Sequence, residues 1–200
     1  MNVWRDRLFR WFAPMARRCP LSPNAITIIA LLLNIVAALL LYRRYFLLAI
    51  VFISIGGLAD AFDGIVARVQ NKSSRFGDFL DHFADRVSDV LLVAGWVLGN
   101  GVRIELTVGA VIAVLLNGYI GTQIEATWHK RDYETVGRGE FVLGMVVWPI
   151  ASHLIYANGL QNLTPGGFTI AEWMALLMVV MAIVGMVQRF LLAARLERRG

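Results

Sequence analysis

Charged residues are scarce in this sequence of 200 residues. Asp, Glu, Lys and Arg make up 16% of it, whereas about 25% is usual for a soluble domain. Hydrophobic residues make up 58% and gather in long blocks, which argues against an ordinary soluble fold. Cysteine is nearly absent too, because Cys19 stands alone, so no disulfide can form within the chain. No low-complexity segment or convincing internal repeat appears.

The net charge of +5 could indicate a nucleic-acid partner in a soluble protein. Here basic loops at a membrane surface account for it, so no nucleic-acid partner is expected. The first 20 residues mix Arg with Trp, Leu and Phe, which predicts an amphipathic helix lying on the membrane surface. The apolar run that follows has full spanning length and lacks a clear small-residue cleavage site, which argues against a cleaved signal peptide.

Six apolar segments can be marked in the rest of the chain, at about 24–42, 46–69, 76–98, 104–128, 141–156 and 169–192. A helix needs about 20 apolar residues to cross a bilayer, so the chain has room for six such helices and little else. The sequence therefore predicts an all-α integral membrane fold in one domain, 1–200. It comprises an interfacial helix over 1–20 and a six-helix transmembrane bundle over 24–192.

The positive charges predict the orientation of this bundle. With the N-terminus in the cytoplasm, only Arg43, Arg44 and Arg103 of the 19 Lys and Arg residues fall in far-side loops, and Arg86 lies within the third segment. Loops rich in Lys and Arg stay in the cytoplasm. We therefore expect a multi-pass protein of a prokaryotic inner membrane, with both termini cytoplasmic.

Four carboxylates stand out where the second and third segments meet: Asp60, Asp63, Asp81 and Asp85. Acidic residues within spanning helices are functional candidates because a lone charge is costly there. Spacings of three and four residues place each pair on one helix face. The short link over 70–75 predicts antiparallel neighbours whose acids meet. Oxygen ligands favour Mg²⁺ or Mn²⁺, and open coordination positions indicate a phosphorylated substrate.

The small residues near these acids have two interpretations. Gly64, Ala67 and Gly77 can let helices approach closely, or they can leave room for a nucleotide. His82 is interpreted as a packing or solvated residue. Asp78 and Asp89 extend the face of the third segment and could pair with Arg86 or Arg68.

A long spaced motif carries a resemblance to a known family. It reads Asp60-x-x-Asp63-Gly64-x-x-Ala67-Arg68, then eight residues, then Gly77-x-x-x-Asp81-x-x-x-Asp85. The chain resembles the CDP-alcohol phosphotransferases at every defining position of this motif. Six spanning helices, the basic N-terminal helix and the Pro23-Asn24-x-x-Thr27 start of the first segment are similar as well.

The resemblance implies an enzyme that transfers a substituted phosphate from a CDP-linked donor, most simply a CDP-lipid such as CDP-diacylglycerol, to an alcohol and releases CMP. Asp60 and Asp81 would bridge two Mg²⁺ or Mn²⁺ ions, Asp63 would bind one of them, and Asp85 the other. Asp85 would also be the general base. Seven residues would contact the CDP group, give it space or close its pocket: Asn24, Thr27, Gly64, Ala67, Arg68, Ser74 and Gly77. The resemblance also implies a homodimer.

The acceptor is expected to be a polar alcohol, inositol phosphate or glycerol 3-phosphate. Lys130, Arg131 and Arg138 could bind its phosphate, or they could be ordinary cytoplasmic-loop cations. Phe141 stands where members that use inositol phosphate tend to have Arg. Transfer of a CDP-aminoalcohol to diacylglycerol uses the same motif and is an alternative. A cation or proton transporter is another, but the acids gather near one face instead of forming a path across the membrane.

Overall fold

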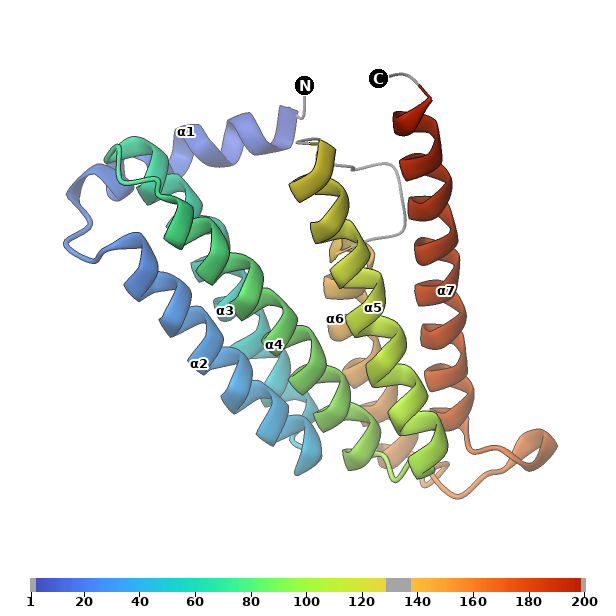
Figure 1. Cartoon of the computed structure of the whole chain (residues 1–200). Coiled ribbons are helices and arrows are strands. Elements are labelled where there is room, and N and C mark those ends of the chain that lie inside the picture. The colour runs from blue at the N-terminus through green and yellow to red at the C-terminus, as the bar shows by residue number, and fades with distance from the viewer. Residues whose placement is uncertain (1–2, 129–137, 199–200) are drawn as a thin grey trace.

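The computed structural model describes residues 3–128 and 138–198, and this part of the chain forms seven α-helices and one short 3-10 helix. Their bounds are α1 (Val3–Arg18), α2 (Pro23–Tyr42), α3 (Phe46–Val69), α4 (Arg75–Gly99), α5 (Ile104–Trp128), α6 (Arg138–Ala157), η1 (Pro165–Gly167) and α7 (Ile170–Glu197). Helices α2 to α7 run side by side as a bundle, and α1 lies across the end where the chain starts and finishes (Figure 1). The predicted all-α fold is confirmed for the described residues.

Local sequence signals explain where three of the helices begin. Ser22 accepts a hydrogen bond from the Ala25 amide at 3.2 Å and caps α2, whose first residue is a proline. Ser74 caps α4 in the same way. Thr169 and Glu172 form a reciprocal capping box at the start of α7. These side chains satisfy amide groups that have no partner inside the helix, so the loops end at defined residues.

Four helices are long and apolar enough to cross a membrane: α2, α3, α5 and α7. The expected count of six spanning helices is not confirmed. Helix α4 has sufficient length but carries several acids and Arg86, and the apolar part of α6, Leu143–Ala157, is shorter than the others. Even so, four such helices with many exposed apolar side chains make the chain an integral membrane protein.

Helix α2 packs against both α3 and α4, while α3 and α4 make few close backbone contacts with each other. The expectation that α3 and α4 pack as direct neighbours is therefore wrong in detail. The reason is that two glycines of α4 face the backbone of α2. A Cβ atom at Gly95 would lie 2.3 Å from the carbonyl oxygen of Ala38, and one at Gly99 would lie 2.3 Å from that of Leu41. Without side chains there, α2 and α4 approach closely and α2 joins the two acidic helices.

The main core lies deeper in the bundle, around Trp96 of α4. Its indole N–H donates a hydrogen bond to the Ser152 hydroxyl of α6 at 3.0 Å, and both side chains are buried.

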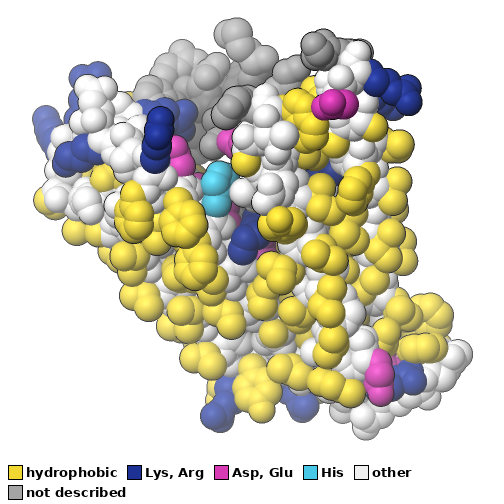
Figure 2. Space-filling model, viewed as in Figure 1, with side chains coloured by type: hydrophobic (Ala, Val, Ile, Leu, Met, Phe, Trp, Pro, Cys, Tyr) yellow, Lys and Arg dark blue, Asp and Glu magenta, His cyan; other side chains and the backbone are white. Residues whose placement is uncertain are grey.

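Hydrophobic side chains surround the middle of the visible face, with most Lys and Arg near its two ends (Figure 2). At the end of the bundle opposite α1, an ion pair links the α4–α5 turn to α7. It joins Arg103 and Glu172 at 2.7 Å.

Candidate functional site

The four aspartates lie toward the α1 end of the bundle, where α3 ends and α4 begins (Figure 1). Asp63 interacts electrostatically with Asp60 on its own helix and with Asp81 on α4. Carboxylates from both helices therefore approach one another, although α3 and α4 make few close backbone contacts. Asp63 and Asp85 are each 6% exposed. Bound cations would stabilise the ionised form of carboxylates that lie this close together.

Asp81, His82 and Asp85 form a group that could hold a metal ion. One ligand atom from each lies within 4.8 Å of the others. Asp81 and Asp85 are one helical turn apart, which brings their carboxylates together. His82 was given no ligand role from the sequence, and the structure places it beside both carboxylates. Its place three residues before Asp85, on the same helix face, was the available signal.

Thr27 of α2 contacts the acidic group directly. Its hydroxyl donates a hydrogen bond to the Asp63 carboxylate at 2.5 Å, and both residues are buried. The resemblance assigned Thr27 to the nucleotide pocket, so this link to a metal-ligand candidate was not foreseen. It arises because α2 packs closely against α3, and that contact joins residues 36 positions apart.

Polar groups surround Gly77 at the start of α4. A Cβ atom there would lie 3.2 Å from the Asn24 amide oxygen and 3.2 Å from the Ser74 hydroxyl oxygen. Ser74 also accepts the Gly77 amide hydrogen bond at 3.0 Å. The beginnings of α2 and α4 therefore meet at Gly77, where a side chain would crowd both polar groups.

Gly64 and Arg68 form a second edge of the site, on α3. The Arg68 guanidinium donates to the Gly64 carbonyl at 2.9 Å, so the side chain turns back along its own helix. A Cβ atom at Gly64 would meet only Arg68, at 3.7 Å. Ala67 is half-buried on the same turn. The predicted CDP contacts thus come from the last turns of α3 and the first turns of α2 and α4.

Three predicted acceptor residues cannot be placed in the same way. Lys130 and Arg131 lie outside the described residues. Arg138 begins α6, but its side chain lies outside the described part.

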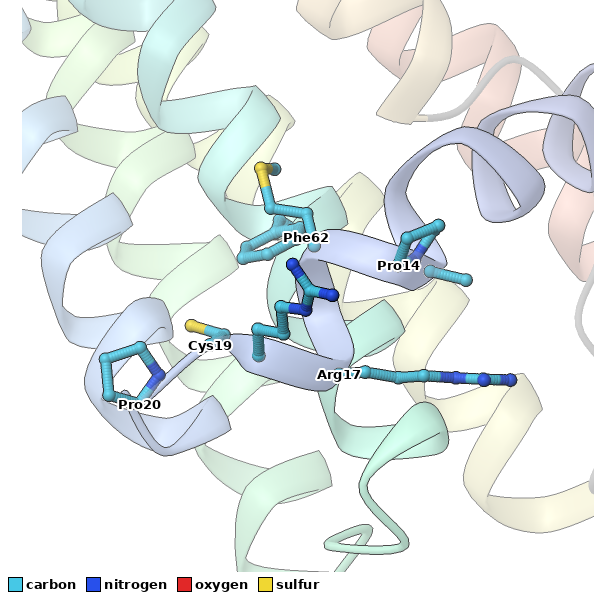
Figure 3. A pocket seen from close by; sticks show the side chains of 8 residues that line it. Pro14, Arg17, Cys19, Pro20 and Phe62 are labelled. Atoms are coloured by element: carbon cyan, nitrogen blue, oxygen red, sulfur yellow. The ribbon is translucent and has the colours of Figure 1, made fainter.

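A separate hollow lies between α1 and α3. Pro14 and Arg17 of α1, Cys19 just beyond it, and Phe62 of α3 are among the residues that line it (Figure 3). None of the four aspartates belongs to this lining. The acidic group and this hollow are therefore different features of the same end of the molecule.

The sequence model of the CDP-alcohol phosphatidyltransferase family matches residues 20–183. An archaetidylinositol phosphate synthase from Pyrococcus horikoshii is 36% identical over 125 residues, which are 62% of each chain. A phosphatidylinositol phosphate synthase from Mycobacterium marinum is 32% identical over 139 residues, 64% of this chain and 58% of that one. These matches span less than two thirds of either relative.

The fold is similar to that of the Mycobacterium tuberculosis phosphatidylinositol phosphate synthase. The crystal structure with CDP-DAG bound superposes with a TM-score of 0.69 at 22% identity, over 90% of this chain and 92% of that one. The complex with manganese and citrate gives a TM-score of 0.68 at 23% identity, over 89% and 86%. At this identity the likeness establishes a shared fold.

Proposed function

Because the chain belongs to the CDP-alcohol phosphatidyltransferase family, we propose that it transfers a substituted phosphate from a CDP-linked lipid to a polar alcohol and releases CMP. The observation that carries this proposal is the convergence of the motif carboxylates from two helices. Asp63 of α3 interacts with Asp81 of α4, and Asp81 lies with Asp85 within ligand-sharing distance. A transporter would need a polar path across the bundle, which this end-localised cluster does not supply.

The acidic group suits two divalent ions. Its carboxylate oxygens are hard ligands of the kind that Mg²⁺ and Mn²⁺ prefer. By the family pattern, Asp60, Asp63, Asp81 and Asp85 would hold the two ions, with Asp60 and Asp81 shared between them. Bound ions would neutralise the charge of the donor pyrophosphate and stabilise the attacking and leaving oxygens. Thr27 would orient Asp63 through the hydrogen bond that its hydroxyl donates to one carboxylate oxygen.

Asp85 is the general base of the proposed reaction. It accepts the proton of the acceptor hydroxyl, whose oxygen forms a new bond to the lipid-linked phosphorus. The bond between that phosphorus and the CMP oxygen breaks, and CMP leaves with the electron pair. Asp85 is buried, so bulk water has little access to the carboxylate that takes the proton. Catalysis here depends mainly on positioning and on charge neutralisation.

The donor nucleotide lies against the small residues of the motif. Gly64, Ala67 and Gly77 leave space for it, and four polar residues border that space: Asn24, Thr27, Arg68 and Ser74. The geometry around Gly77 supports this arrangement, since an amide oxygen and a hydroxyl already approach the place where a side chain would stand. The start of helix α4 also favours a nearby negative phosphate.

Inositol phosphate is the acceptor that we propose. The relatives from Pyrococcus horikoshii and Mycobacterium marinum are both named as synthases of inositol phosphate lipids. In this proposal Lys130, Arg131 and Arg138 would bind its phosphate. Glycerol 3-phosphate and the CDP-aminoalcohol reaction are the alternatives that an acceptor panel separates.

Six helices, α2 to α7, cross a prokaryotic inner membrane in this proposal, and the active site faces the cytoplasm. Both chain ends and the α3–α4 turn lie at the same end as α1 (Figure 1). That end holds most of the Lys and Arg in the sequence, as expected for a cytoplasmic face. Two copies form a homodimer, which light scattering of the purified protein in detergent tests directly.

The test is CMP release by purified protein supplied with CDP-diacylglycerol and Mg²⁺ or Mn²⁺. Parallel reactions contain inositol phosphate, glycerol 3-phosphate, free inositol or no acceptor. We expect release only with inositol phosphate, and almost none from the Asp85→Asn variant. A wild-type protein that releases no CMP with any acceptor, yet carries cations across liposome membranes, would contradict the proposed enzyme and favour the transporter.

A further inference from the structure

Arg86 of α4 directly follows Asp85 in the chain, but it points to a different part of the bundle. Its Nη2 atom lies 3.2 Å from the Asp89 carboxylate, one turn further along the helix. Asp89 is 6% exposed and the Arg86 side chain is 21% exposed. The sequence named Arg86 as one of two possible partners for Asp89, and the structure selects it. A charged pair inside a membrane bundle needs a functional or specific structural reason.

The guanidinium of Arg86 occupies a slot on α5 that only glycine leaves open. A Cβ atom at Gly118 would overlap Arg86 Nη1 and would lie 2.5 Å from Cζ. The end of the Arg86 side chain therefore takes the place that the side chain of residue 118 would otherwise fill. Any substitution of Gly118 must move the guanidinium, while the α5 backbone can stay where it is.

Two contacts hold the guanidinium in this slot. One is the ion pair with Asp89 through Nη2, and the other is the fit over Gly118. The third nitrogen, Nε, is buried and has no hydrogen-bond partner among the described residues. Arg86 is therefore not held by a saturated hydrogen-bond network, so its position depends strongly on the open slot at Gly118.

These contacts lie beside Asp85 on the α5 side of α4. On the α2 side, Asn34 donates a hydrogen bond to Ser88 at 3.1 Å, so α4 is held from both directions at this height. A carboxylate roughly 6 Å from the helix axis moves by about 1 Å when the helix turns by about 10°. A misplacement of about 1 Å can reduce a reaction rate by about 100-fold.

We propose that Arg86 is a positioning residue: it holds Asp85 where this carboxylate can act as the general base. This inference rests on the proposed function. Arg86 does so by locking α4 against α5 through the slot at Gly118, with Asp89 fixing the direction of the guanidinium. A purely structural ion pair would contribute to the stability of the fold alone. A positioning residue must change the turnover of protein that remains folded.

Gly118→Ala is the main test, because it displaces the guanidinium without altering any motif residue. The matched control is Gly109→Ala on the same helix, where a Cβ atom meets nothing within 4 Å. We expect Gly118→Ala to lower kcat by about 10-fold or more, with the donor KM changed less than about twofold. The unfolding temperature should stay close to that of the control, since the displaced group is the end of a flexible side chain.

A second background shows whether Gly118 acts through Arg86. Arg86→Met combined with Asp89→Asn removes the ion pair without leaving a buried charge uncompensated. In that background Gly118→Ala should change kcat less than about twofold, because the group that it displaces is gone. An equal loss in both backgrounds overturns the proposal, and so does a wild-type kcat in Gly118→Ala.

Manganese affinity provides a readout that does not depend on turnover. Electron paramagnetic resonance of free Mn²⁺ measures binding to each purified variant. We expect Gly118→Ala to bind Mn²⁺ at least about threefold more weakly than Gly109→Ala, because a shifted Asp85 is a poorer ligand. Equal affinities overturn the positioning role. Absence of CMP release from the wild type would instead contradict the proposed function, and the Mn²⁺ comparison would still decide the role of Arg86.

Discussion

Replacing Gly95 by alanine should force α2 and α4 apart. An ideal Cβ atom at this position lies 2.3 Å from the carbonyl oxygen of Ala38, 3.0 Å from its carbonyl carbon and 3.1 Å from its Cα. Ordinary contact begins at about 3.4 Å, so the new methyl group is about 1 Å too close to a backbone that no rotamer change can move. One of the two helices must shift by about that distance.

The cost of this shift follows from overpacking, which typically destabilises a core by about 1–3 kcal/mol. For a chain of this size, each kcal/mol corresponds to about 2–4 °C in the unfolding temperature. We therefore expect Gly95→Ala to unfold roughly 5 °C below the wild type. Turnover should fall as well, because α2 carries Thr27, which hydrogen-bonds to Asp63.

Thermal unfolding in detergent, followed by tryptophan fluorescence, measures the first effect. CMP release by the folded protein measures the second. The control is Gly57→Ala in α3, which makes the same chemical change where nothing lies within 4 Å. It should be neutral or stabilising by up to about 1 kcal/mol, since alanine favours a helix more than glycine does. A Gly95→Ala protein as stable and as active as Gly57→Ala would refute the close approach of α2 and α4.

Three further outcomes are expected. Thr27→Val keeps the shape of the side chain but removes its hydrogen bond to Asp63, so we expect Mn²⁺ binding to weaken by about 10-fold in a titration. Unchanged binding would mean that Thr27 does not orient the carboxylate. Ser152→Ala leaves the Trp96 indole N–H without its acceptor and should cost about 1–3 kcal/mol in unfolding free energy, measured by denaturant unfolding; an unchanged value would mean that the hydrogen bond does not stabilise the core. Treatment with EDTA should abolish CMP release, and either Mg²⁺ or Mn²⁺ should restore it; activity that survives EDTA would argue against the proposed metal site.

Sequence alone was sufficient for the helices of the described residues and for the grouping of Asp81 with Asp85. Helix starts follow from local chemistry, such as Ser22 before Pro23 and the Thr169–Glu172 capping box, which act within a few residues. The pairing of Asp81 with Asp85 also follows from helical spacing. In contrast, the six spanning helices stay a prediction: four of the described helices are long and apolar enough by themselves, and the acids that mark the site make α4 polar.

The amino-acid pattern by itself determined the helical class, the acidic motif and the family, because each depends on residue type and on spacing along one or two neighbouring helices. Only the tertiary structure decided which helices touch. It packed α2 against both α3 and α4, brought Thr27 to Asp63, and seated Arg86 over Gly118. Such contacts depend on the shapes of surfaces far apart in the chain, and a glycine that admits a neighbouring helix looks the same in sequence as one that faces open space.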